Sequence, residues 1–328
     1  MSSVRAVVVS FADPEATVRA VDSLHGQMAP PEEVVVVDNG RNLAGFRLAA
    51  EVLVPAENVG YAAAANLGAE STRCDWIFFL NPDAVAAPNA LKELLLCAND
   101  GVGAVGCQVL LPDGRVNAGD NPVHLSGLSW SGRYGEAVEE GPPREVASLS
   151  GAGLLVRADA WKEVGGLDPA YFLYHDDVDL CLRLRLAGWA VVFQPGAHVT
   201  HDFEFLSGRG KFYFLERNRL WTVFSLYRAA TLILLSPLLL ATEAAVLARS
   251  FSEGWWREKL RALGSVASSF SYLRRRRADV QASRRVSDRE LLALTTATLE
   301  TPLAPSSLAR RVSPLIELYK SLVMRLVR

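Results

Sequence analysis

The sequence lacks several features that would assign it to a common class of protein. It contains four cysteines in 328 residues, and none forms a C-x-x-C pair or a zinc-like spacing. A disulfide-bonded secreted domain is therefore disfavoured, and buried thiols in a reducing compartment are expected. There is no G-x-G-x-x-G after the first apolar run and no G-x-x-x-x-G-K-[ST]. Dinucleotide-binding domains and P-loop enzymes are disfavoured for that reason.

Long apolar runs are also scarce. The first residues show no charged segment followed by a long apolar stretch, so we expect no signal peptide and a cytoplasmic location. The longest charge-free run in the tail covers residues 229–242, which is 14 residues and includes Pro237. A bilayer span needs about 20 residues. This run therefore indicates a re-entrant or interfacial element, with a buried core helix as the alternative.

Charge is distributed unevenly along the chain. Residues 202–328 carry 21 Lys and Arg against 11 Asp and Glu, whereas residues 1–201 carry 13 against 25. The tail includes a polybasic segment, residues 274–277 and 284–285, and an amphipathic end, residues 315–327. An apolar element combined with basic residues predicts peripheral attachment to a membrane surface. Solvated helix faces are the alternative explanation for these charges.

The most informative stretch is the apolar run 76–80, which ends in Asn81-Pro82-Asp83. Such a run predicts a strand buried on both faces, and Pro82 should terminate it. Asp83 would then lie at the carboxyl end of a sheet, where ligands bind in open α/β folds. A carboxylate there is placed to hold a divalent cation against a phosphate group. A solvated turn aspartate is the alternative.

Strands and helices alternate through the first part of the chain. The apolar runs 6–10 and 33–37 end at Ser10 and Asp38. A helix is expected after the first run, with Asp13 as its N-cap and Pro14 at its first position, and a second helix is expected over residues 62–69. This alternation predicts a doubly wound, mostly parallel sheet with helices on both faces. We expect this α/β domain to cover residues 1–205 and a helical, basic, membrane-associating region to cover residues 206–328. The Gly- and Pro-rich residues 112–148 predict loops over the site.

A second acidic cluster lies in residues 171–180. Residues 181–186 alternate in polarity like a strand, but Asp176, Asp177 and Asp179 gather before them and Gly188 follows them. Acids at the start and a glycine at the end favour a helix. Asp179 is expected to be a first-turn acid that favours the helix dipole.

Taken together and in this order, these segments resemble the family 2 inverting glycosyltransferases with the GT-A fold, and especially the rhamnosyltransferase-like branch. The resemblance covers roughly residues 4–225. The segments that carry it are residues 7–11, 35–39, 58–66, 80–83 and 165–180.

The resemblance implies roles for individual residues. Asp177 would be the general base, with Asp176 at the position where glutamate is more usual. Asp83 and His201 would hold Mg²⁺ or Mn²⁺, although His198 could take the place of His201. Residues implied to bind the nucleotide sugar are Ser10, Phe11, Asp38, Asn58, Gly60, Asn66, Asn81 and Asp83. Residues expected to line the acceptor side are Gly151, Ala152, Asp176 and Trp130.

One departure from the family pattern affects the metal. Asn81 stands where the first acid of an Asp-x-Asp motif is usual, so the cation has one fewer charged ligand. A metal would neutralise the charge that develops on the departing nucleoside diphosphate, and a carboxylate would take the acceptor's proton. A single direct displacement inverts the anomeric centre.

The implied reaction transfers rhamnose from its dTDP form to a hydroxyl of a lipid-linked or cell-envelope saccharide. A UDP-sugar transferase such as a galactofuranosyltransferase is one alternative, and a non-catalytic nucleotide-sugar-binding scaffold protein is another. The implied partners are a dTDP- or UDP-sugar donor and a saccharide or polyprenyl-linked glycolipid acceptor. The inner face of the cell membrane and a second copy of the chain are further expected partners, and nucleic acid is not.

Overall fold

The computed structural model describes residues 2–201, 208–299 and 306–327. Within these residues the chain forms two compact units. The first unit contains residues 2–121, 131–184 and 189–201, and the second contains residues 122–130, 185–188, 208–299 and 306–327. The predicted boundary at residue 205 lies outside the described residues.

A large sheet forms the centre of the first unit. Its strand order is β3-β2-β1-β4-β11-β6-β12-β5, and the first four strands are parallel neighbours. Their bounds are Val4–Ser10 (β1), Glu33–Asp38 (β2), Glu51–Leu53 (β3) and Trp76–Leu80 (β4). This half confirms the parallel, doubly wound arrangement predicted from the sequence.

The other half of the sheet is mixed. β11 runs antiparallel to both β4 and β6, whereas β12 runs parallel to β6 and antiparallel to β5. The bounds are Ala84–Ala86 (β5), Val102–Leu110 (β6), Gly153–Arg157 (β11) and Ala190–His201 (β12). β12 spans 12 residues, because its pairing with β6 resumes at His198 after an irregularity. This extension carries His201 to the edge where β4 ends.

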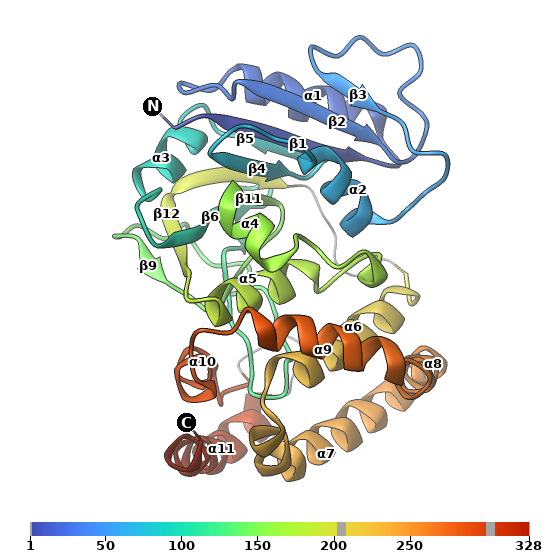
Figure 1. The fold of residues 1–328 in the computed structure, drawn as a ribbon, viewed down its shortest axis with the longest axis vertical. Helices are drawn as coiled ribbons and strands as arrows, with labels where there is room; N and C mark the ends of the chain where they lie inside the picture. The colour runs from blue at the N-terminus through green and yellow to red at the C-terminus, as the bar shows by residue number, and fades with distance from the viewer. Residues whose placement is uncertain (1, 202–207, 300–305, 328) are drawn as a thin grey trace. The chain divides into compact units, whose positions relative to one another are not determined.

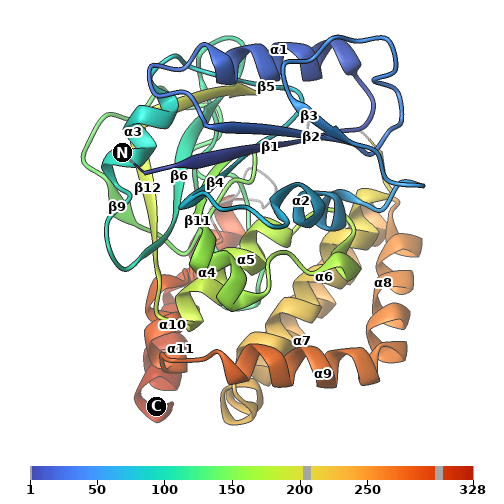
Figure 2. The same cartoon turned by 45° about the horizontal axis from the view of Figure 1, so that its top comes forward.

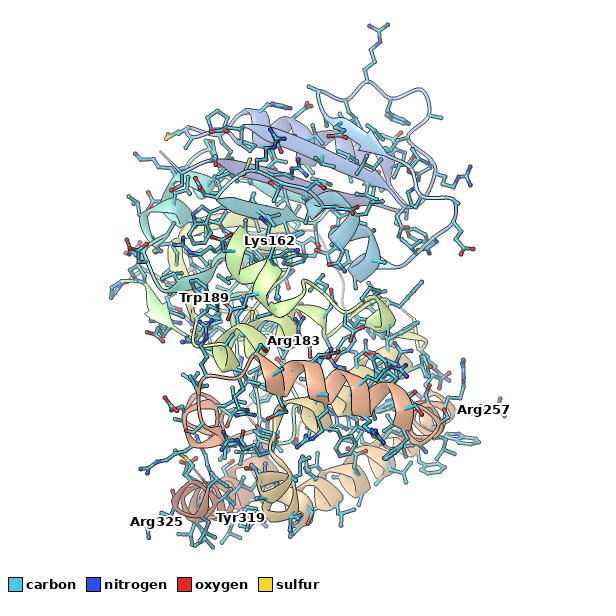
Figure 3. The ribbon with its side chains drawn as sticks, viewed as in Figure 1. Lys162, Arg183, Trp189, Arg257, Tyr319 and Arg325 are labelled. Atoms are coloured by element: carbon cyan, nitrogen blue, oxygen red, sulfur yellow. The ribbon has the colours of Figure 1, made fainter. Side chains whose placement is uncertain are left out.

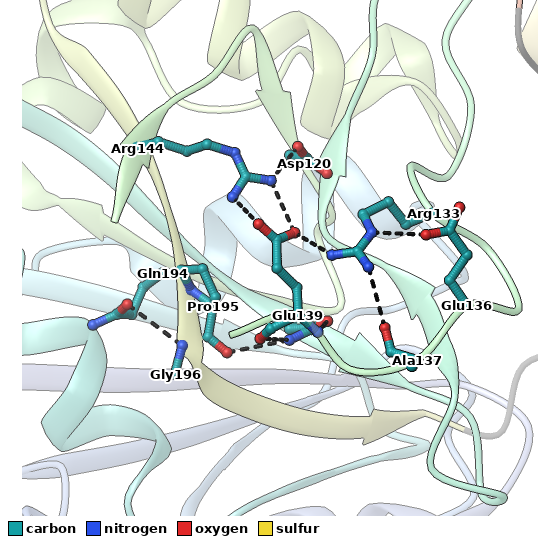
Figure 4. Close-up of polar contacts among 10 residues, drawn as sticks. Asp120, Arg133, Glu136, Ala137, Glu139, Arg144, Gln194, Pro195 and Gly196 are labelled. Carbon is teal, nitrogen blue, oxygen red and sulfur yellow. Dashed lines mark hydrogen bonds and ion pairs between the residues drawn. The ribbon is translucent and has the colours of Figure 1, made fainter. Parts of the chain in front are cut away.

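Residues 112–148 contain short strands as well as loops. β7 pairs with β6, β9 pairs with β12, and β8 and β10 form a separate two-stranded sheet. Their bounds are Val116–Ala118 (β7), Asp120–Asn121 (β8), Arg144–Glu145 (β9) and Ser148–Leu149 (β10). In Figure 4, ion pairs join Glu139 to Arg133 and Arg144, and Arg144 also pairs with Asp120 at 2.6 Å. These charge pairs join parts of the segment to one another. Gln108 of β6 holds the segment against the sheet, because its side-chain amide exchanges two hydrogen bonds with the Glu139 backbone at 3.1 and 2.8 Å.

Helices cover both faces of the sheet, as Figure 2 shows with α1 on one side and α2 on the other. Asp13 caps α1 by accepting a hydrogen bond from the Ala16 amide, and Pro14 occupies its first turn, as predicted. The bounds are Pro14–His25 (α1), Tyr61–Ala69 (α2), Ala90–Leu96 (α3), Ala158–Val164 (α4) and Asp176–Leu186 (α5), with a 3-10 turn at Pro169–Tyr171. The predicted helix after the second acidic cluster is confirmed as α5.

Continuous apolar strands arise because alternate residues enter two separate cores. Val8 and Phe78 point into the core that contains residues of α1 and α3, while Val7 and Phe79 point into the core with residues of α2, α4 and α5. α2 approaches the sheet so closely that a Cβ on Gly68 would lie 2.5 Å from Val7 Cγ1. The small residues of α2 are therefore required for packing.

The second unit is helical. In Figure 1, α6, α8 and α9 pack together, and α7, α10 and α11 complete the unit. The bounds are Lys211–Leu226 (α6), Ala229–Ser252 (α7), Trp256–Ser268 (α8), Phe270–Ala282 (α9), Asp288–Leu294 (α10) and Ser306–Leu326 (α11).

Part of the predicted polybasic segment serves the fold of this unit. Arg277 donates to the carbonyl oxygens of Phe224 and Tyr227, both at 2.6 Å, at the end of α6. Arg284 pairs with Asp288 at 2.7 Å and also donates to the Leu226 carbonyl. These cations satisfy carbonyls that a helix end leaves unpaired. Arg277 and Arg284 therefore contribute to the fold of this unit, whereas Arg274 and Arg275 are exposed.

The apolar run of the tail lies in a longer helix than expected. α7 continues through Pro237 for 24 residues, which is long and apolar enough to cross a membrane by length and composition. Only 11% of its most apolar window is buried within the structure. This exposure argues against the core-helix alternative.

Candidate active site

The end of β4 brings together a carboxylate, an amide and an imidazole. His201 is the last residue of β12 and pairs in register with Ala84, directly after Asp83. Its Nε2 lies 2.9 Å from Asp83 Oδ1 and 3.4 Å from Asn81 Nδ2. The imidazole is buried, whereas the Asp83 side chain is 38% exposed. Asp83 can therefore reach a ligand while His201 holds it in place.

His198 is the alternative partner for this cluster. It pairs in register with Gln108, and its Nε2 is buried without a hydrogen-bond partner among the described residues. Of the two histidines, His201 is the one that contacts Asp83. The geometry therefore favours His201 as the ligand candidate.

A tight turn before β11 links Asp177 to the end of β4. Asp177 accepts hydrogen bonds from the Gly151 amide at 3.0 Å and from the Val178 amide at 2.8 Å. The next residue, Ala152, accepts a hydrogen bond from the Asn81 amide at 3.1 Å. A Cβ on Gly151 would lie 3.3 Å from the Asp177 Cβ, so a side chain at this position would crowd the carboxylate. Asp83, Asp177 and His201 thus share one edge of the sheet.

Asp176 lies behind this edge in a small apolar pocket. The pocket is lined by Tyr61, Phe79, Gly151, Leu154, Trp161, Leu167, Asp176, Asp177 and Leu180. Burial, followed by the charge of Asp177, raises the pKa of Asp176. Burial also raises the pKa of Asp177, although the Gly151 and Val178 amides oppose that rise. Asp177 is thus better stabilised in its charged form, and a proton shared by the two carboxyl groups resides preferentially on Asp176.

The backbone just before these acids is strained. Phe172, Tyr174 and His175 all have positive φ angles, of 64°, 66° and 65°. Non-glycine residues in this conformation each cost about 1 kcal/mol or more and cluster at functional sites. The Phe172 carbonyl accepts a 2.6 Å hydrogen bond from the Tyr61 amide and so fixes the start of α2.

A buried ion pair holds this strained segment. Arg183 donates to Asp179 at 2.7 Å and to the Val164 and Gly166 carbonyls at 2.6 and 2.7 Å. Asp179 also accepts a hydrogen bond from the Tyr171 hydroxyl at 3.0 Å. Asp179 remains a first-turn acid, as expected, but its partner is a buried guanidinium. Sequence reasoning missed Arg183, although its spacing of four from Asp179 was the signal that could have identified it.

The residues predicted to hold the nucleotide lie after β1, β2 and β4 or at their ends, just before α2, and within α2. Ser10 pairs in register with Asp38. The two carboxylate oxygens of Asp38 accept hydrogen bonds from the backbone amides of Asn42 and Leu43. Phe11, the next residue after Ser10, is 52% exposed. Asp38 therefore shapes the loop after β2, and its contact with a base or ribose stays a prediction.

Asn58, Gly60 and Asn66 also fix backbone geometry. Asn58 Oδ1 accepts hydrogen bonds from Asn39 Nδ2 and from the Gly60 amide, both at 2.9 Å. The side-chain amide of Asn66 makes two hydrogen bonds with the backbone of Leu167. At Gly60, φ is 81° and a Cβ would lie 2.5 Å from the Phe172 ring, so only glycine fits. Trp130 belongs to the second unit, so its predicted place beside this site stays a prediction.

The sequence is similar to those of known proteins. A family described as glycosyltransferase like family 2 matches residues 2–220. The N-acetylglucosaminyl-diphospho-decaprenol L-rhamnosyltransferase of Mycobacterium tuberculosis is 32% identical over 62% of this chain and 77% of its own length. The galactofuranosyltransferase GlfT1 of the same species is 28% identical over 57% of this chain and 66% of its own.

A solved structure supports the fold. The mannosyltransferase PcManGT of Pyrobaculum calidifontis, in complex with GDP-Man and Mn²⁺, superposes with a TM-score of 0.51 at 19% identity, covering 86% of each chain. The predicted GT-A-like fold is thereby confirmed.

Proposed function

Because this chain belongs to the family 2 glycosyltransferases, we propose that it transfers rhamnose from dTDP-rhamnose to a hydroxyl group of a polyprenyl-linked saccharide. The observation that carries the proposal is the single edge of the sheet shared by Asp83, Asp177 and His201. The rhamnosyl donor and lipid-linked acceptor are suggested by the Mycobacterium tuberculosis relative, whose length the chain covers to 77%.

In this proposal Asp177 is the general base. Two backbone amides hold its carboxylate at the start of α5, so it does not need to reorganise to accept a proton. The acceptor hydroxyl loses its proton to Asp177 as its oxygen attacks the anomeric carbon, and the bond to the nucleoside diphosphate breaks. One displacement leaves the product with inverted configuration.

Asp83 and His201 fit a divalent cation that arrives with the donor. They offer one half-exposed carboxylate and one imidazole 2.9 Å apart, and Mg²⁺ or Mn²⁺ commonly takes its remaining ligands from phosphate oxygens and water. Among the described residues, no group of three or more His, Cys, Asp or Glu side chains would hold a metal alone. When bound, the cation would supply positive charge to the departing diphosphate.

We further propose that the first unit works at the cytoplasmic face of the membrane, where a polyprenyl-linked acceptor is accessible. The exposed apolar surface of α7 supports a peripheral attachment. A second candidate function is transfer of galactofuranose from its UDP form, because GlfT1 matches over 66% of its length.

The test is a panel of nucleotide sugars with a polyprenyl-diphosphate saccharide acceptor and product detection by mass. The proposal predicts turnover with dTDP-rhamnose that is at least tenfold above that with UDP-galactofuranose, and dependence on Mg²⁺ or Mn²⁺. Preference for UDP-galactofuranose would replace the first candidate by the second. Absence of transfer from every donor would overturn both.

A further inference from the structure

The outer side of α7 is an uninterrupted apolar stripe. Exposed residues recur with helical spacing at Ile233, Pro237, Leu240, Ala244 and Phe251. Ile233 is 72% exposed and Leu240 is 70% exposed. No charged residue falls within this stripe along the fully described helix, which at 1.5 Å per residue is about 36 Å long.

α11 carries a second stripe of exposed apolar residues. Leu315, Leu318, Leu322 and Leu326 are all at least half exposed and recur at helical spacing. The Tyr319 hydroxyl donates to the Leu234 carbonyl and so ties α11 to α7. Figure 3 shows Tyr319 and Arg325 along α11.

Cations accompany the apolar residues. Arg311 and Arg325 are exposed and fall on the same side of α11 as its leucines. Elsewhere in the second unit, Arg257, Arg261 and Arg274 are also exposed. A leucine face bordered by arginines matches an anionic lipid surface, because the leucines enter the acyl boundary while the guanidinium groups stay with the headgroups.

The opposite side of α7 is fixed to the unit by charge. Glu243 pairs with Lys259 at 2.5 Å and also with Arg219, and Glu216 pairs with both cations at 2.5 and 2.7 Å. Lys259 is fully buried and Arg219 is 2% exposed. A membrane-spanning α7 would have to carry Glu243 into hydrocarbon or break these pairs, either of which is costly. A helix lying in the membrane plane keeps them intact.

We propose that α7 and α11 together form a docking surface that lies in the plane of an anionic bilayer, with both helices on the membrane and neither across it. This proposal deepens the peripheral attachment named under the proposed function and rests on it. Vesicle binding is measured without donor or acceptor, so its outcome is independent of transferase activity.

The first experiment is co-flotation of the full chain with phosphatidylcholine vesicles, with or without phosphatidylglycerol. Wild-type protein should partition at least tenfold better onto the anionic vesicles, and added salt should weaken binding. The double variant Leu240→Asp/Leu322→Asp should lose at least tenfold in partitioning. Leu240→Ala/Leu322→Ala, which keeps the surface uncharged, should lose about threefold and covers the case in which the aspartates disturb folding.

The matched control is Met28→Asp/Leu96→Asp, which changes two equally exposed apolar residues of the first unit, at 69% and 63%. It should float like wild type. Equal flotation of wild type and Leu240→Asp/Leu322→Asp would overturn the proposal. So would a wild-type dimer that ignores vesicles and dissociates in this variant, because the surface would then bind a second copy of the chain.

Orientation is tested by spin labels at Ile233→Cys, Leu240→Cys and Phe251→Cys on vesicle-bound protein. The four native cysteines are buried, and unsubstituted protein controls for their labelling. Equal, shallow depths at all three positions are expected for an in-plane helix. A label at Leu240→Cys much deeper than the other two would show that α7 crosses the bilayer.

Discussion

The two units of this protein use apolar and charged residues in opposite ways. The first unit buries Val, Ile and Phe on both faces of its sheet and leaves a carboxylate and an imidazole at one edge. The second unit buries a four-charge cluster between α6, α7 and α8 and exposes leucines on α7 and α11. A buried charge loses its hydration, and ion pairs at hydrogen-bond distance compensate for that loss without adding much net stability. The difference supports the proposal that the exposed leucines of the second unit contact a bilayer.

The largest expected effect concerns the acidic edge of the first unit. Asp177→Asn should lower turnover by about 10³-fold, because the variant cannot accept the acceptor's proton. Binding of dTDP should be unchanged. Asp159→Asn, an exposed first-turn acid of α4, is the matched control and should retain full turnover. Steady-state kinetics with product detection measures both variants, and a fully active Asp177→Asn would remove this residue from catalysis.

The buried charge cluster should give the largest change in stability. Among the described residues, Lys259→Met leaves Arg219 as the ion-pair partner of both Glu216 and Glu243, and the variant should lower the free energy of unfolding by about 3 kcal/mol. Burial alone would raise the pKa of Glu216, but Arg219 and Lys259 lower it to about 2 in the wild-type protein, so the variant removes one of the two cations that stabilise this buried carboxylate. Lys162→Met, at an exposed site on α4, should change little in chemical denaturation. A stable Lys259→Met protein would show that the cluster is dispensable.

A smaller effect separates the two kinds of arginine in the polybasic segment. Arg277→Ala removes two hydrogen bonds from carbonyls at the end of α6 and should lower the free energy of unfolding by about 1 kcal/mol. Arg274→Ala, in the same helix but exposed, should leave stability unchanged. Thermal unfolding of the two variants provides the measurement. Equal effects would contradict the distinction between a structural and a surface arginine.

A final effect, of about the same size, has the opposite sign. Burial raises the pKa of Asp176 above its unfolded value, so the folded state binds this proton more tightly. Below the unfolded pKa, Asp176 is protonated in both the folded and the unfolded state, so its burial carries no charge penalty. The free energy of unfolding then falls as pH rises from the unfolded pKa toward the folded pKa. Asp176→Asn should therefore stabilise the protein by about 1 kcal/mol at pH 8 and by nothing at pH 3. Denaturant unfolding at the two pH values tests this, and destabilisation at pH 8 would contradict it.

Much of the first unit was predictable because its signals are local. The run 76–80 matches β4 residue for residue, and the capping pattern at Asp13 and Pro14 places the start of α1. β11 was missed as an antiparallel strand, since strand direction depends on its pairing with β4 and β6, which are distant in sequence.

The sequence named candidate site residues, but it did not predict the contacts that hold them in place. The contact between Asp83 and His201 joins positions 118 apart in sequence, and only the family resemblance linked them beforehand. The turn at Gly151 that holds Asp177 depends on tertiary packing, and so do the hydrogen bonds from Arg183 to the Val164 and Gly166 carbonyls. In the tail, composition identified the basic residues, but their division into structural and exposed arginines required the positions of the α6 carbonyls.

The assignment of the cation to Asp83 and of proton transfer to Asp177 is tested most directly by calorimetry. In this experiment dTDP, with and without Mn²⁺, is titrated into wild type, Asp83→Asn and Asp177→Asn. We predict that Mn²⁺ strengthens dTDP binding at least tenfold in wild type and in the inactive Asp177→Asn, and that Asp83→Asn loses this gain. A gain that persists in Asp83→Asn, or disappears in Asp177→Asn, would contradict the assignment of cation and base to these two carboxylates.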